Sequence, residues 1–207
     1  MNQLQFITHD NGRYDHLTGA KLALQGGCKW IQLRMKHADD EQFIKAGHTL
    51  RELCDEYQAT LILDDRVELV KEIGAKGVHL GQKDMPISQA RQFLGEDYII
   101  GGTANTIEEI QRHADDGADY IGCGPYRFTS TKENLAPLLG LNGYKQLLLE
   151  MKQRGITLPL VAIGGITLDD LPEITSIGIR NVAISGAILD ATNPIETTKA
   201  FINQLNS

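Results

Sequence analysis

The feature that most constrains the fold is an alternation of strand-like and helix-like segments, which recurs about eight times along the chain. Each short apolar or β-branched run is followed by a longer stretch of helical periodicity. The strand candidates are residues 4–8, 30–34, 60–64, 77–80, 98–101, 120–123, 159–163 and 181–185. Because the connections between the strand and helix candidates are short, the strands must run parallel. Eight such units predict an α/β fold, a (β/α)8 TIM barrel that forms a single catalytic domain over residues 1–207.

Helix signals agree with this prediction. The clearest helix candidates are residues 41–57, 107–115 and 144–153, and shorter ones follow Asp65, Ser88, Asp169 and Pro194. Glycine-containing turns end several helices, at residues 26–27, 74–75, 117–118 and 178–179. An open doubly wound sheet would carry a glycine-rich dinucleotide-binding turn after its first strand, and residues 8–12 do not form one. We therefore expect a closed barrel and no nicotinamide cofactor.

Composition excludes several classes of partner. The 20 Lys and Arg residues against 27 Asp and Glu give a net charge of -7, the wrong sign for binding nucleic acid through its phosphates. No apolar run approaches the roughly 20 residues that span a bilayer, and residues 1–5 lack the features of a signal peptide. We expect a cytoplasmic protein with neither nucleic acid nor membrane as a partner. Cys28, Cys54 and Cys123 lack metal-binding or disulfide spacing and are expected in the core.

The second predicted strand carries a row of polar side chains on one face. Its period of two places Gln32, Arg34 and Lys36 together, facing the barrel mouth. The opposite face is apolar and meets the helices: Ile31, Leu33 and Met35. An amide, a guanidinium and an ammonium in a row suit a diphosphate group. The alternative is that the two cations pair with neighbouring carboxylates.

Carboxylates follow the next two strands. The third strand ends in Asp64 and Asp65, and Asp84 comes shortly after the fourth strand. Adjacent parallel strands deliver these groups to one rim of the barrel, where Mg²⁺ takes one or two carboxylates together with water and phosphate oxygens. The alternative is that Asp65 caps the helix beginning near Arg66, and that Asp84 caps a turn.

Loops that suit a second phosphate follow the sixth to eighth strands. Residues 124–132 are rich in hydroxyl groups and end in Lys132, and a solvated surface loop is the alternative. Gly164 and Gly165 follow the seventh strand and Ser185 ends the eighth, which is the usual phosphate-binding position of such barrels. His79 points inward on the fourth strand, and a hydrogen-bonded interior histidine is favoured over a catalytic base.

Taken together, residues 32–36, 64–69, 79–84, 129–132 and 162–166 resemble the thiamine phosphate synthase family over nearly the whole chain. The resemblance implies an Mg²⁺-dependent transferase of thiamine biosynthesis. Such an enzyme joins 4-amino-5-hydroxymethyl-2-methylpyrimidine diphosphate to 4-methyl-5-(2-hydroxyethyl)thiazole phosphate and releases diphosphate.

The resemblance also implies roles for individual residues. The residues implied to bind the pyrimidine diphosphate are Gln32, Arg34, Lys36, Asp64, Thr103 and Lys132, and those implied to bind the thiazole phosphate are Thr129, Thr131, Gly165, Ile184 and Ser185. Asp65 and Asp84 would ligate the metal. Arg34, Lys36 and Lys132 would act in catalysis, because they neutralise the departing diphosphate as its charge develops.

This chain departs from the family pattern at two positions, with Asp64 where Asn is usual and Thr103 where Ser is common. Asp64 could contact the metal, Arg66 or another group.

Two rival functions are a thiazole tautomerase of the same barrel type and a non-catalytic sensor of a thiamine precursor. The paired aspartates and residues 129–132 favour the synthase over both. The sequence leaves open the oligomeric state, homo-oligomers included, and whether Mn²⁺ replaces Mg²⁺. Residues 126–139 are the candidate lid, with hinges near Pro125 and Gly140.

Overall fold

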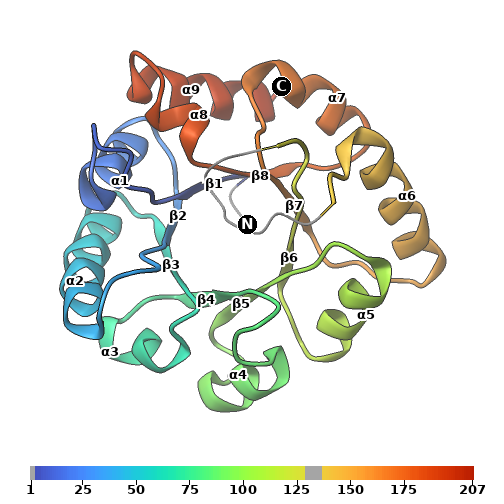
Figure 1. Cartoon of the computed structure of the whole chain (residues 1–207), viewed down its shortest axis with the longest axis horizontal. Helices are drawn as coiled ribbons and strands as arrows, with labels where there is room; N and C mark the ends of the chain where they lie inside the picture. The colour runs from blue at the N-terminus through green and yellow to red at the C-terminus, as the bar shows by residue number, and fades with distance from the viewer. Residues whose placement is uncertain (1–2, 129–136) are drawn as a thin grey trace.

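The computed structural model describes residues 3–128 and 137–207. Eight parallel strands close into a barrel in chain order, and the helices form a ring around it (Figure 1). The strands are β1 (Leu4–Ile7), β2 (Trp30–Leu33), β3 (Thr60–Asp64), β4 (Gly77–Leu80), β5 (Ile99–Thr103), β6 (Tyr120–Cys123), β7 (Leu160–Ile163) and β8 (Asn181–Ile184). β8 pairs with β1 and closes the barrel. The predicted (β/α)8 fold is confirmed.

The helices alternate with the strands, and short turns of 3-10 helix precede two of them. The α-helices are α1 (His16–Gln25), α2 (Asp40–Glu56), α3 (Val70–Ile73), α4 (Ile87–Leu94), α5 (Ile107–Asp115), α6 (Gly140–Gln153), α7 (Leu171–Ser176), α8 (Gly186–Leu189) and α9 (Pro194–Leu205). The 3-10 turns are η1 (Val67–Leu69) and η2 (Leu168–Asp170). Within the described residues, no helix is long and apolar enough to cross a membrane.

Local chemistry explains where several helices begin and end. The carboxylate of Asp39 accepts a 2.8 Å hydrogen bond from the backbone of Gln42 at the start of α2, and Thr106 forms a capping box with Glu109 at the start of α5. Gly74 ends α3 in the left-handed conformation, with φ of 76°. The glycine turns expected from the sequence therefore lie where helices return to the next strand.

The largest difference from the predicted elements is at β5, which extends to Thr103 instead of ending at residue 101. Gly101 and Gly102 have low strand propensity, yet both lie within the ladder. A Cβ on Gly101 would lie 2.1 Å from the ring of Tyr120, so the interior packing requires glycine there. Two helices also differ, since α6 begins four residues before the predicted 144 and the short α8 was not predicted.

The core has two parts. The larger part lies between the strands and the helices, and it includes all three cysteines. The smaller part fills the inside of the barrel and consists of Trp30, Ile62, Tyr120, Val161 and Ala183. The rings of Trp30 and Tyr120 meet edge to face with centroids 5.0 Å apart. These side chains close the barrel interior, so the polar groups gather at its mouth.

Candidate active site

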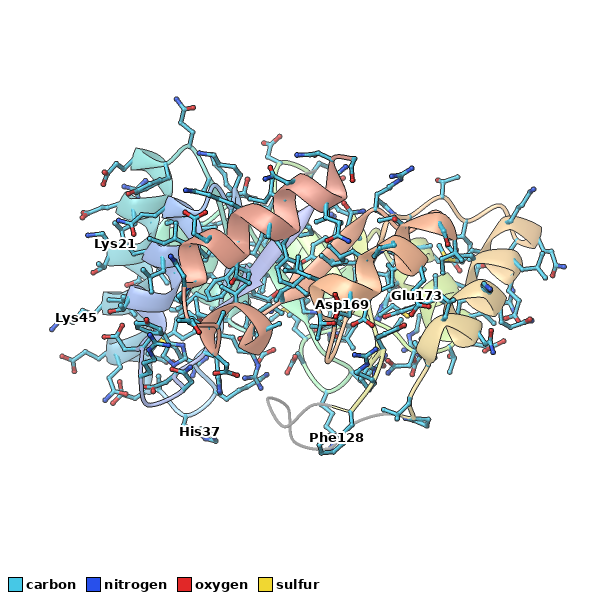
Figure 2. All side chains as sticks on the ribbon, turned by 90° about the horizontal axis from the view of Figure 1, so that it is seen from above. Lys21, His37, Lys45, Phe128, Asp169 and Glu173 are labelled. Carbon is cyan, nitrogen blue, oxygen red and sulfur yellow. The ribbon has the colours of Figure 1, made fainter. Side chains whose placement is uncertain are left out.

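The loops that follow the strands share one end of the barrel, which we call the mouth. Figure 2 shows His37, from the loop after β2, and Phe128, from the loop after β6, at this same end of the molecule. A cavity of about 140 Å³ at the mouth is lined by Lys36, Asp64 and Asp65, among others. A larger cavity of about 400 Å³ lies elsewhere, on the outer surface between α1 and α2. The cavity at the mouth is therefore lined in part by residues singled out in the sequence.

The polar row after β2 lies where the period of two placed it. Ile31 and Leu33 pack in the core between strands and helices, while Gln32 is buried on the other face. Both cations of the row lie close to Asp64: Arg34 Nε is 3.6 Å and Lys36 Nζ is 3.2 Å from its Oδ2. The pairing with carboxylates that the sequence allowed is therefore present, and it occurs at the mouth.

Lys36 bridges the two consecutive aspartates. Its ammonium also forms an ion pair and hydrogen bond with Asp65. Burial alone would lower the pKa of Lys36, but Asp64 and Asp65 together raise it above its usual value. Lys36 is thus held as a cation at the mouth.

Asp65 and Asp84 come from different strand ends and form a hydrogen bond with each other. Burial, followed by the neighbouring Asp84 and Asp64 carboxyls, raises the pKa of Asp65 to about 7. Burial would also raise the pKa of Asp84, but the hydrogen bonds from Asp65 and from the Gly81 N–H lower it instead. Of the two carboxyls, Asp65 therefore holds a proton more readily than Asp84.

The backbone conformation at Asp65 determines which groups its carboxyl contacts. Asp65 has φ of 65°, in the left-handed region that few residues other than glycine adopt. The N-cap position of η1 belongs to Arg66, and no side chain of the described residues caps it. The capping role considered for Asp65 is therefore wrong, because its carboxyl meets Asp84 instead. The turn-capping role of Asp84 is confirmed by a 2.6 Å hydrogen bond from the Gly81 N–H.

The carboxyl pair fits a hard cation such as Mg²⁺. Two carboxyl groups held against each other repel once both are ionised, and a bound cation offsets that repulsion. No cluster of three or more His, Cys, Asp or Glu side chains suited to a metal occurs in the described part of the chain. Mg²⁺ takes one or two carboxylates and completes its shell with water and phosphate oxygens, so two ligands are sufficient.

Thr103 lies at the end of β5 and is held by the barrel interior. His79 Nε2 is 2.9 Å from the Thr103 hydroxyl, and His79 Nδ1 is 3.1 Å from the hydroxyl of Tyr120. Gln5 donates a 3.3 Å hydrogen bond to that same Tyr120 hydroxyl. The expectation of a hydrogen-bonded interior histidine is confirmed. Its contacts fix the position of the Thr103 hydroxyl at the mouth.

The loops after β6 and β7 pack closely against each other. Gly164 and Gly165 have φ of 97° and 68°, and a Cβ on Gly165 would lie 2.5 Å from Arg127 Cγ. Arg127 donates a 3.0 Å backbone hydrogen bond to the carbonyl of Gly164. The glycine pair is therefore required by the neighbouring loop, and it leaves the backbone at the end of β7 uncovered by side chains of its own.

At the end of β8, the two predicted residues differ in orientation. Ser185 Oγ is buried and has no hydrogen-bond partner within the described residues. A buried hydroxyl without a partner favours a ligand that supplies one. Ile184 is 3% exposed and packs in the core between strands and helices. The side chain of Ile184 is therefore not available to a substrate.

Three predicted residues, Thr129, Thr131 and Lys132, lie outside the described residues, as does most of the candidate lid. One residue at the mouth was missed. Thr8 is buried at the end of the first strand, where its hydroxyl accepts a 2.9 Å hydrogen bond from the Arg34 N–H and lies 3.2 Å from Nδ1 of His16. A polar residue at a strand end was the signal that could have found it.

A closed parallel barrel with paired carboxyls, a cationic row and glycine turns at its mouth belongs to the class of barrel enzymes that handle phosphorylated small molecules. The model of the thiamine monophosphate synthase family matches residues 4–188. The chain belongs to this family, as its motifs led us to expect, and is a transferase of thiamine biosynthesis.

Similar proteins agree with the family match. The chain is 55% identical to a thiamine-phosphate synthase of Bacteroides fragilis over 203 residues, which cover 98% of this chain and 100% of that protein. It is 53% identical to the Phocaeicola vulgatus thiamine-phosphate synthase, with 97% of each chain covered. A solved structure of thiamine phosphate pyrophosphorylase from Pyrococcus furiosus superposes with a TM-score of 0.86 at 31% identity, covering 99% of this chain and 95% of that one.

Proposed function

We propose that the chain makes thiamine phosphate from 4-amino-5-hydroxymethyl-2-methylpyrimidine diphosphate and 4-methyl-5-(2-hydroxyethyl)thiazole phosphate, with Mg²⁺ held by Asp65 and Asp84. The observation that carries the proposal is the contact between these two carboxyls beside the cation Lys36. A diphosphate bound together with a divalent cation needs both signs of charge within a few ångströms. The ends of β2, β3 and β4 supply them.

In the proposed reaction, the bond between the pyrimidine methylene carbon and the diphosphate oxygen breaks, and its electron pair leaves with the diphosphate. The lone pair of the thiazole nitrogen then forms the new bond to that carbon. Mg²⁺, when bound, supplies Lewis-acid charge to the diphosphate oxygens. No protein nucleophile is needed, because the pyrimidine amino group delocalises the positive charge at the carbon.

The chain's own residues would stabilise and orient the reacting groups. Arg34 and Lys36 neutralise the charge that develops on the leaving diphosphate, and Lys36 is poised for this because it already contacts both aspartates. The amide of Gln32 is buried beside them, and its Oε1 has no partner among the described residues. This oxygen is available to a donor on the substrate.

The second phosphate would occupy the opposite side of the mouth. The backbone at Gly165 and the hydroxyl of Ser185, which has no partner among the described residues, belong to the loops after β7 and β8, where barrels of this type hold phosphate. Thr103, fixed by His79, would contact the pyrimidine ring between the two anion sites. Holding the two rings between separated anion sites brings the nitrogen to the carbon in one orientation, which lowers the entropic barrier.

The direct test is incubation of the purified protein with both substrates and Mg²⁺, followed by mass detection of thiamine phosphate. We expect product and diphosphate in equal amounts, and no product when either substrate is omitted or when EDTA removes the metal. Folded protein that forms no thiamine phosphate under these conditions contradicts the proposal. Product formed at the same rate in EDTA contradicts the metal assignment alone.

A further inference from the structure

Asp64 is the centre of the cationic row, although its side chain is only about 8% exposed. Its Oδ1 accepts a 2.6 Å hydrogen bond from Gln32 Nε2. Its Oδ2 is the atom close to both Arg34 and Lys36, at 3.6 and 3.2 Å. Arg66, the other cation considered for Asp64, pairs instead with Asp40 and donates a 2.8 Å hydrogen bond to the carbonyl of Ala38. One carboxylate therefore contacts all three members of the row.

These contacts have an electrostatic consequence for an anionic substrate. Among the side chains described here, the cations Arg34 and Lys36 face three carboxyl groups, those of Asp64, Asp65 and Asp84. The two cations are thus already balanced before any ligand arrives. Because Asp64 is buried, solvent and salt screen its charge poorly, and it also repels a diphosphate that approaches Arg34 and Lys36.

We propose that Asp64 is a positioning residue that holds Gln32, Arg34 and Lys36 in one row, and that its charge makes diphosphate binding depend on Mg²⁺. With Arg34 and Lys36 balanced, the described part of the site has little net positive charge to offer a free diphosphate. A diphosphate that arrives with a divalent cation brings the missing positive charge, and Asp65 and Asp84 bind that cation. Asp64 therefore selects the metal complex of the substrate over the free anion.

This inference rests on the proposed function, since it assumes that the row binds the diphosphate. An amide at position 64 separates the two roles of the residue. Asp64→Asn keeps an oxygen that accepts from Gln32, so Gln32 stays positioned, but it removes the negative charge that Arg34 and Lys36 contact. Asp64→Ala removes both the charge and the acceptor. Asp97→Asn is the matched control, because Asp97 is exposed and precedes β5 at the opposite end of the barrel.

The experiment measures binding of inorganic diphosphate by isothermal titration calorimetry, once in excess Mg²⁺ and once in EDTA. For each protein we take the dissociation constant in EDTA divided by the dissociation constant in Mg²⁺. For Asp64→Asn we expect this ratio to fall by about tenfold or more, chiefly because binding in EDTA tightens when a charge a few ångströms from the ligand is removed. Asp97→Asn should keep the wild-type ratio.

Asp64→Ala separates positioning from charge. We expect it to lose metal dependence like Asp64→Asn, and also to bind diphosphate about tenfold more weakly in Mg²⁺ because Gln32 is no longer held. Melting curves confirm that each variant is folded, and Asp64→Asn alone decides the charge question if Asp64→Ala does not fold. An unchanged ratio in Asp64→Asn overturns the inference but leaves the synthase proposal intact. Wild-type protein that binds no diphosphate in Mg²⁺ overturns both.

Discussion

The carboxyls of Asp65 and Asp84 hydrogen-bond to each other, although they come from different strand ends and Asp65 reaches this position through a left-handed backbone conformation. Such conformations cost free energy and are retained where the rest of the structure holds them, often at functional sites. The same turn also brings Asp65 into contact with Lys36. The carboxyl pair and the cation therefore form one charged cluster, which the following experiments probe.

Removing one carboxylate should remove the metal site. We expect Asp65→Asn and Asp84→Asn each to lower the rate of thiamine phosphate formation at saturating substrates at least about a hundredfold, equivalent to about 2.7 kcal/mol of transition-state stabilisation. Steady-state rates at several Mg²⁺ concentrations measure this. Asp97→Asn is the control for loss of a carboxylate far from the mouth. Wild-type rates in both site variants would refute the assignment of these ligands.

The raised pKa of Asp65 predicts how metal-free stability depends on pH. The folded value is about 7, whereas the unfolded value is near 3.8. Between these values the folded state holds a proton that the unfolded state has lost, so the stability this group contributes falls as pH rises toward 7. In EDTA, the melting temperature of Asp65→Asn relative to wild type should therefore increase from pH 5 to pH 8. A difference that is constant across this range would contradict the raised pKa.

Gly165 and Gly155 allow a matched test of the loop after β7. Their φ values are 68° and 69°, so alanine strains the backbone equally at both. A Cβ at Gly165 meets Arg127 Cγ at 2.5 Å, whereas no atom of the described residues lies within 4 Å of one at Gly155. We expect Gly165→Ala to raise the KM for thiazole phosphate about tenfold or more by displacing the loop, and Gly155→Ala to leave it unchanged. Equal KM values in the two variants would show that the loop after β7 does not contribute to binding thiazole phosphate.

The thiols should be unreactive in the folded protein. Burial raises the pKa of Cys28 to about 11 and, as the largest of several causes, the pKa of Cys54 and of Cys123 to about 12. Attack on a disulfide reagent requires the thiolate, which is scarce at pH 8 for such groups. Ellman's reagent should label none of the three cysteines in native protein within minutes, and all three after denaturation. Rapid labelling of any one in the native state would show that its side chain is exposed.

Much of the fold could be predicted because barrel strands are buried on both faces and read as short apolar runs. The bounds of β3, β4 and β6 agree with the sequence pattern. The predicted bounds of β5 were wrong because its glycines carry no strand signal. Their place in the ladder depends on the rings of Tyr120 and His113, which lie where a Cβ would have to be. Such steric information comes from another strand and a helix, so no local pattern contains it.

The candidate site shows the same division. Period-two alternation put Gln32, Arg34 and Lys36 on one face, because side-chain direction along a strand is a local property. The sequence left open whether Asp65 caps a helix or lies against Asp84, because an aspartate suits either role. The left-handed turn at Asp65 decided it.

By itself, the sequence determined the barrel, the family and the set of charged residues at the mouth, because periodicity and motif order are properties of the chain. Only the tertiary structure decided how those charges pair. Asp64 could have paired with Arg66, and the pairing of β2 with β3 placed it against Gln32, Arg34 and Lys36 instead. Pairing energies depend on distance and burial, and both arise only when strands far apart in sequence are brought side by side.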